Sequence, residues 1–303
     1  MTASDLGAAW RCSGASLLRD EPIAGTASTV KAFLLVEHTG SWGVNALRDA
    51  RLPHGLGNHL LLSGRAAGVR VLLARRPDRS GTGEVRVHAA YADPVSPWLE
   101  SAAFGDVHEV LDLDLRPLGR GRSIGLEPAE GPMFAVCTHG KHDACCAERG
   151  RPVAAALEAA HPEETWEVSH LGGDRFAANM VVLPFGLYYG RLDPVSAIAV
   201  AGSQLSGHLE LDHLRGRSGL PTPVQVAEIA LRRHLEETRG DAVRYVGWTR
   251  GDEGLSTSRF EVAGTTYAVR VRTRTGERER LTCQAVKDNP IPVHEVVDIS
   301  TYS

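Results

Sequence analysis

The chain has 303 residues, of which 43% are hydrophobic and 23% charged, a composition typical of soluble globular proteins and unlike that of disordered or fibrous chains. Its 33 lysines and arginines stand against 37 acidic residues, and the formal net charge of −4 argues against a sequence-independent nucleic-acid binder. We therefore expect no nucleic-acid partner, and the length predicts two packed domains.

The expected compartment follows from missing signals. No stretch approaches the roughly 18 apolar residues that span a bilayer, and residues 1–14 lack the basic start and apolar core of a signal peptide. We expect a cytoplasmic protein with no membrane partner, and the sequence leaves its oligomeric state open. Disulfides are rare in the cytosol, so the five cysteines are expected to be packing residues, metal ligands or redox thiols.

The first half of the chain alternates strand and helix patterns. Helical spacing over residues 42–62, broken at Pro53, follows a first predicted strand. Apolar or β-branched runs bounded by Gly, Pro and Asp predict strands at residues 32–37, 69–74, 84–88 and 107–113. This order with short connections predicts an open α/β sheet. The Gly- and Pro-rich residues 116–132 then suggest a boundary between an N-terminal α/β domain, 1–128, and a second domain, 129–303.

The second half opens with a similar alternation. Predicted strands lie at residues 133–137, 165–169, 179–183 and 187–190, and predicted helices at 146–160 and 194–205. The resulting βαβββα order is typical of a thioredoxin-like fold. The N-terminal domain can be interpreted as a degenerate copy of the same fold.

A helix and a β extension complete the second domain. Residues 224–238 have amphipathic spacing. The side chains expected to face inward are Val226, Ile229, Ala230 and Leu235, and those expected to face outward are Arg232, Arg233, Glu236 and Glu237. Alternating patterns predict strands at residues 244–249, 258–262, 267–274 and 293–299.

Two loops concentrate the residues with reactive chemistry. Cys137, Cys145 and Cys146 fall within ten residues, where a predicted strand gives way to a helix, and the loop from His170 follows the next strand. A right-handed crossover between parallel strands would bring both loops to one edge of the sheet. Thiolates and imidazoles together suit zinc or an iron–sulfur cluster, whereas Mg²⁺ and Ca²⁺ prefer oxygen ligands.

Several motifs are similar to those of a known family. They are Glu-Pro-Ile-Ala-Gly-Thr-Ala at 21–27, Cys-Thr-His-Gly at 137–140, Gly-Arg-Pro at 150–152 and Leu-Pro-Phe-Gly-Leu-Tyr-Tyr-Gly at 183–190. With these motifs the chain resembles the sucrase/ferredoxin-like family, whose relatives include a yeast actin-patch-associated protein. The resemblance implies a C-terminal thioredoxin-like ferredoxin domain with a [2Fe–2S] cluster held by C-x₈-C and H-x₃-H motifs. It thereby implies Cys137, Cys146 and His170 as ligands.

The fourth position departs from the family pattern, because Asp174 stands where the second histidine is expected. We favour Asp174 as the fourth ligand because it occupies the position of the family's second histidine. Cys145 offers a thiolate, which is a better ligand for iron than a carboxylate. It adjoins Cys146, however, and neighbouring side chains tend to diverge. His139 and His142 on the first loop are further alternatives. Asp174 can also be interpreted as a cap for the following segment.

Cluster charge indicates the chemistry of such a site. With two thiolates, a neutral histidine and an ionised aspartate, an oxidised [2Fe–2S] site carries −1, between four-cysteine and two-histidine clusters. This predicts one-electron transfer or redox sensing with a redox partner protein, rather than an enzyme with its own substrate. The alternatives are a structural zinc-binding interaction module and a thiol oxidoreductase using Cys145 or Cys146. Cys12 and Cys283 are expected to be small buried packing residues, dispensable for the cluster.

Overall fold

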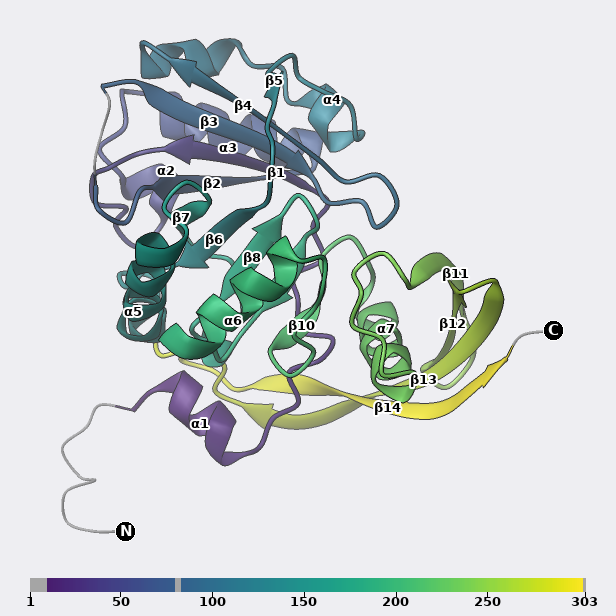
Figure 1. Ribbon diagram of the computed structural model, residues 1–303. Coiled ribbons are helices and arrows are strands. Elements are labelled where there is room, and N and C mark those ends of the chain that lie inside the picture. Colours follow the sequence, from purple (N-terminus) through teal and green to yellow (C-terminus); the bar gives the residue numbers. More distant parts are fainter. Residues whose placement is uncertain (1–9, 80–82, 302–303) are drawn as a thin grey trace.

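The computed structural model describes residues 10–79 and 83–301, and the expectation about the N-terminus therefore lies largely outside the described residues. A large mixed sheet with helices packed against it stands beside a smaller antiparallel sheet (Figure 1). This arrangement confirms the predicted α/β class. The strand order of the large sheet is β10-β9-β8-β6-β7-β2-β1-β3-β4-β5, and that of the small sheet is β11-β12-β13-β14.

The strands of the large sheet come from both halves of the chain. They are β1 (Ala32–Glu37), β2 (Val69–Arg75), β3 (Val85–Tyr91), β4 (Trp98–Phe104), β5 (Glu127–Pro128), β6 (Met133–Cys137), β7 (Thr165–Val168), β8 (Met180–Leu183), β9 (Leu187–Tyr189) and β10 (Leu214–Arg217). The small sheet comprises β11 (Arg244–Arg250), β12 (Leu255–Val262), β13 (Thr265–Glu279) and β14 (Asn289–Thr301).

The helices occupy the connections. They are α1 (Cys12–Leu18), α2 (Ala46–Asp49), α3 (Leu56–Ala67), α4 (Arg116–Gly119), α5 (Ala144–Ala160), α6 (Pro194–Leu205) and α7 (Thr222–His234), with 3₁₀ helices η1 (Val107–Asp112) and η2 (Asp174–Phe176). Within the described residues, no helix has both the length and the apolar character needed to cross a membrane.

The two halves of the large sheet repeat one strand order. In the first half β1 pairs parallel to β2 and antiparallel to β3, which pairs antiparallel to β4. In the second half β6 pairs parallel to β7 and antiparallel to β8, which pairs antiparallel to β9. The halves meet where β2 and β7 pair antiparallel. The repetition agrees with interpreting the first half as a copy of the second, while the boundary at residue 128 stays a prediction.

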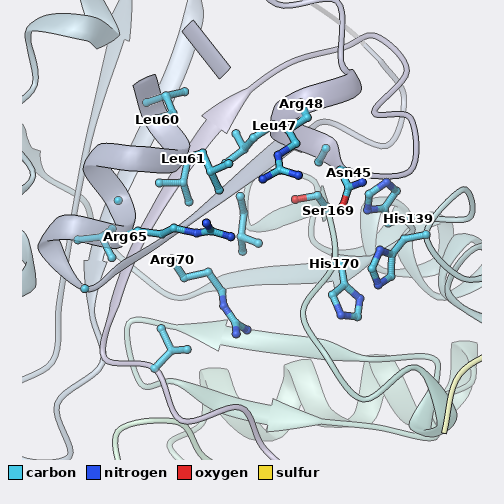
Figure 2. Close-up of a pocket in the computed structure, with 18 of the residues that line it drawn as sticks. Asn45, Leu47, Arg48, Leu60, Leu61, Arg65, Arg70, His139, Ser169 and His170 are labelled. Atoms are coloured by element: carbon cyan, nitrogen blue, oxygen red, sulfur yellow. The ribbon is translucent and has the colours of Figure 1, made fainter. Parts of the chain in front are cut away.

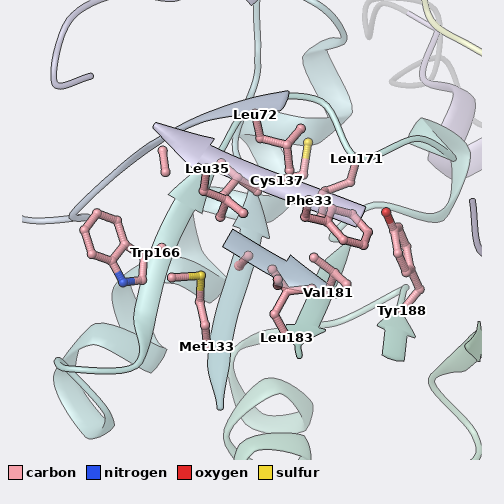
Figure 3. Close-up of a cluster of buried hydrophobic side chains, with 14 of the residues drawn as sticks. Phe33, Leu35, Leu72, Met133, Cys137, Trp166, Leu171, Val181, Leu183 and Tyr188 are labelled. Atoms are coloured by element: carbon pink, nitrogen blue, oxygen red, sulfur yellow. The ribbon is translucent and has the colours of Figure 1, made fainter. Parts of the chain in front are cut away.

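Both halves contribute to one buried apolar cluster on a shared face of the sheet. Figure 3 shows Phe33 and Leu35 of β1 packed near Met133 of β6 and Val181 of β8. All six residues of β1 are buried, as expected for a strand covered on both faces. The opposite faces pack against α3 in the first half and against α5 and α6 in the second. The junction of the halves is therefore a packed core.

The strand predicted at residues 107–113 is wrong, because this segment forms the 3₁₀ helix η1. Asp106 caps it by accepting a hydrogen bond from the His108 N–H at 2.9 Å, and the Glu109 carboxylate accepts one from the Asp106 N–H at 2.9 Å. In this capping box the N–H groups of Asp106 and His108 donate to side chains, so they are not free to pair with a neighbouring strand. The edge of the sheet is instead the short strand β5, which pairs with β4.

The outward orientation predicted for Arg232 is also wrong. Its side chain is fully buried, and its Nε donates to Glu228 Oε1 at 3.1 Å. One guanidinium nitrogen also donates to the backbone carbonyl of Arg239 at 2.7 Å. The chain beyond α7 and the small sheet cover a helix that the amphipathic pattern predicts to be half-exposed, so Val226 and Ile229 are buried, as predicted, and Arg232 is buried with them.

A buried histidine of β3 makes the folding stability of the protein depend on pH. The His88 ring packs edge-on to Trp166 with centroids 4.9 Å apart, and neither ring nitrogen has a hydrogen-bond partner among the described residues. Burial, helped by Arg76 and Arg86, lowers the pKa of His88 to about 3 from its ordinary 6.5. Below pH 6.5 the unfolded chain gains a proton that the folded chain does not, so this residue costs stability as the pH falls.

We expect His88→Leu to flatten that dependence. Between about pH 6.5 and about pH 4.5 the wild type should lose about 2 kcal/mol of unfolding free energy more than the variant, since one pKa unit corresponds to about 1.4 kcal/mol. Urea unfolding of both proteins at several pH values measures the difference. Parallel pH curves for the two proteins would show that His88 is protonated in the folded state.

Candidate metal centre

The first loop of the site connects β6 to α5. Cys137 is the last residue of β6, and Cys146 lies in the first turn of α5. The helix begins here because the Asp143 carboxylate accepts a hydrogen bond from the Cys145 N–H at 2.9 Å, which satisfies an otherwise unpaired donor. Both sulfurs are buried. The parallel pairing of β6 and β7 then places the loop after β7 beside them, as the sequence predicts.

The second loop brings His170 and Asp174 to the same place. Ligand atoms of Cys137, Cys146 and His170 all lie within 4.8 Å of one another. Asp174 Oδ1 lies 3.0 Å from His170 Nδ1 and accepts a hydrogen bond from the Cys146 thiol at 3.2 Å. The loop bends at Gly173, whose φ of +78° suits glycine, and a Cβ there would collide with the Arg215 guanidinium. The four residues favoured from the sequence therefore converge.

The ionisable groups of the site shift one another's pKa values. Burial tends to lower the pKa of His170, but hydrogen bonds and attraction from Asp174 and Cys137 raise it to about 9. Burial likewise tends to raise the pKa of Asp174, but its contact with His170 holds it below the ordinary value. A hydrogen bond from Cys146, together with His170, lowers the pKa of Cys137. These interactions thus favour anionic Cys137 and Asp174 beside a cationic His170, whereas the hydrogen bond to Cys137 and burial raise the pKa of Cys146.

The other two histidines of the first loop have different positions. His139 donates through Nε2 to the Gly43 carbonyl at 2.8 Å and packs edge-on to Trp42, so it contacts the N-terminal half. His142 stacks on His170 with ring centroids 3.8 Å apart, and its Nε2 lies 3.9 Å from Asp174 Oδ2. Of these two alternative ligands, His142 belongs to the rim of the site.

Cys145 lies apart from Cys137, although it adjoins Cys146. Its sulfur lies 3.7 Å from that of Cys12 and 3.5 Å from that of Cys283. This second group of cysteines is not evident from the sequence, in which Cys12 and Cys283 are expected to be separate packing residues. No motif could have revealed it, because the three residues are 133 and 138 positions apart along the chain.

A basic cavity opens on the histidine side of the site. It has a volume of about 810 Å³ and is lined by His139, His142 and His170 together with Lys31, Arg48, Arg65 and Arg70. Figure 2 shows Arg65 and Arg70 reaching toward the space that His170 borders. The His170 side chain is 32% exposed and that of Asp174 only 3%. Solvent therefore reaches the site through its histidines, while the thiols and the carboxylate are buried.

Of three comparisons with known proteins, one gives a match. The model of a family described as sucrase/ferredoxin-like matches residues 23–216. Neither the curated proteins nor the solved structures gave a match. The matched segment contains Cys137, Cys146, His170 and Asp174, which belong to groups that could hold a metal ion. Because it covers more than half of the sequence, the chain belongs to the sucrase/ferredoxin-like family.

Proposed function

We propose that Cys137, Cys146, His170 and Asp174 hold a [2Fe–2S] cluster and that the protein transfers single electrons or senses redox state. The observation that carries the proposal is the convergence of four donors in two pairs, one pair from each loop. Two buried thiols come from the β6–α5 connection, and an imidazole and a carboxylate 3.0 Å apart come from one loop after β7. A two-iron cluster requires two ligands on each iron.

The donor chemistry fits the group. Two soft thiolates and an imidazole suit iron in a cluster, and the buried carboxylate of Asp174 supplies the fourth donor. Cys146 Sγ lies 3.2 Å from Asp174 Oδ1, so a cluster between them has to displace this hydrogen bond. The two glycines before Asp174, with φ of +96° and +78°, give the loop a backbone that carries no side chains to obstruct that adjustment.

The surroundings suit an electron carrier. When bound, the cluster supplies a one-electron couple, and a site charge of −1 when oxidised favours a potential between about −400 mV and the range of about −150 to +300 mV. Buried Cys137 and Cys146 are shielded from water, whereas the partly exposed His170 borders the cavity. The arginines of the cavity favour an acidic partner or an anionic reductant at that side.

A second candidate function, structural zinc binding, rests on a separate observation. Donor atoms of Cys137, Cys146 and His170 lie within 4.8 Å of one another, a separation that one metal ion also accommodates. A structural zinc ion would make the protein an interaction module. The two candidates differ in colour, because zinc is colourless and a [2Fe–2S] cluster absorbs visible light.

Variants of Asp174 test the ligand set. If its carboxylate binds iron, Asp174→His removes one negative charge and should raise the reduction potential. Asp174→Cys keeps the charge but supplies a softer donor, so it should strengthen the thiolate-to-iron absorption. Redox titration at fixed pH and electron paramagnetic resonance of the reduced proteins measure both effects.

The exposed Asp112 in η1 provides the control for charge, since Asp112→His changes the net charge by the same amount and lies outside both ligand loops. This control should leave the potential and the g-values where they are in the wild type. Unchanged potentials and g-values in both Asp174 variants would show that Asp174 is not a ligand and would point to His142, which lies next to it.

A further inference from the structure

Three cysteines from distant parts of the chain form a compact triangle of sulfur atoms. The Sγ atoms of Cys12 and Cys145 lie 3.7 Å apart, those of Cys145 and Cys283 3.5 Å, and those of Cys283 and Cys12 3.6 Å. Cys12 and Cys145 are fully buried, and Cys283 is half-buried. Both carboxylate oxygens of Asp143 lie 3.7 Å from the Cys12 sulfur.

These separations are close to the distances between ligand atoms in a tetrahedral zinc site. With Zn–S bonds of about 2.3 Å, tetrahedral geometry places two sulfur ligands about 3.8 Å apart. A carboxylate oxygen bound at about 2.0 Å would lie about 3.5 Å from each sulfur. Three thiolates and one carboxylate make a four-donor set that zinc accepts, and soft sulfur ligands exclude Mg²⁺ and Ca²⁺.

The surrounding hydrogen bonds hold the donors in place. Asp143, fully buried, accepts from the Cys145 N–H at 2.9 Å and from the Cys283 N–H at 2.7 Å. The Ser13 hydroxyl donates to the Cys145 sulfur at 3.2 Å. Outer hydrogen bonds of this kind orient the ligands of metal sites. A bound cation would also compensate the charge of a buried carboxylate grouped with three thiols, because buried charges are paired or bind metals.

We propose that Cys12, Cys145, Cys283 and Asp143 form a zinc site separate from the candidate cluster. Zn–S bonds replace three S–H bonds, and the protons pass to solvent. The ion would join α1 and the β13–β14 connection to the first turn of α5, near which both lie (Figure 1). Cys12 and Cys283 fall outside the family-matched residues 23–216, so two of the four proposed ligands come from parts of the chain that the family model does not cover.

Metal analysis of the full-length protein, purified without air from zinc-supplemented cells, tests the site. We expect one zinc ion per chain in the wild type. Cys283→Ala should lose the zinc and keep its iron, because the Cys283 sulfur contacts those of Cys12 and Cys145 and is not grouped with that of Cys137. Cys137→Ser is the matched control, and it should lose iron and keep zinc. This reciprocal result separates failure of the zinc site from failure of the cluster.

A second measurement does not depend on the variant folding. Wild-type protein stripped of zinc and titrated with Co²⁺ should develop intense thiolate-to-cobalt absorption that levels off at one ion per chain. A wild type without zinc, zinc that persists in Cys283→Ala, or a disulfide among these cysteines in the anaerobic protein would each overturn the proposal. So would the absence of thiolate-to-cobalt absorption in the titration.

Discussion

Cys137→Ser and Cys146→Ser proteins are each expected to be colourless and to contain no iron. A serine hydroxyl is a hard donor and a poor substitute for a thiolate on iron, so losing either sulfur removes half of the ligand pair on one iron. Both side chains are buried, so no external thiol can take their place. Visible absorption and iron content of anaerobically purified protein measure the effect.

Cys283→Ala is the control for general cysteine loss, since its sulfur contacts those of Cys12 and Cys145 instead. It should keep the full colour. Circular dichroism of each serine variant establishes that the chain is folded. Full colour and two irons per chain in both serine variants would refute these two ligand assignments.

Glu228→Gln is expected to have the largest effect on stability outside the metal centre. Glu228 is 4% exposed and accepts hydrogen bonds from two buried arginines, Arg217 at 3.2 Å and Arg232 at 3.1 Å. Glutamine keeps the shape but removes the charge, which leaves two guanidinium groups buried without an anion. Breaking a buried ion pair in this way costs about 3–5 kcal/mol of unfolding free energy.

Urea unfolding measures the change, with Glu236→Gln at an exposed position just beyond the end of α7 as the matched control. The control should lie within about 0.5 kcal/mol of the wild type, as surface substitutions do. A loss below about 1 kcal/mol for Glu228→Gln would mean that water or other groups compensate the arginines.

The sequence was sufficient to predict the elements around the candidate centre. The apolar run at 133–137 predicts β6, the strand pattern at 165–169 predicts β7, and the Ala-rich segment between them predicts α5, with bounds within two residues of those observed. Parallel strands with a crossover helix leave little freedom, so the loops of Cys137 and His170 had to meet at one edge. Local pattern and topology together therefore determine which residues converge.

Other features depend on contacts that local patterns do not encode. The burial of Arg232 arises because the segment after α7 folds back and supplies the Arg239 carbonyl. The triangle of Cys12, Cys145 and Cys283 requires the first described helix and the last hairpin to meet at α5. In both cases the partners lie in separate elements, and only the packed structure brings them together.

Iron, acid-labile sulfide and zinc analysis of the anaerobically purified wild type, combined with electron paramagnetic resonance after reduction, tests the central claim most directly. The proposed cluster predicts two irons and two sulfides per chain, visible absorption that bleaches on reduction, and a one-electron paramagnetic signal. A colourless protein without iron, or one with zinc bound by Cys137 and Cys146, would contradict it.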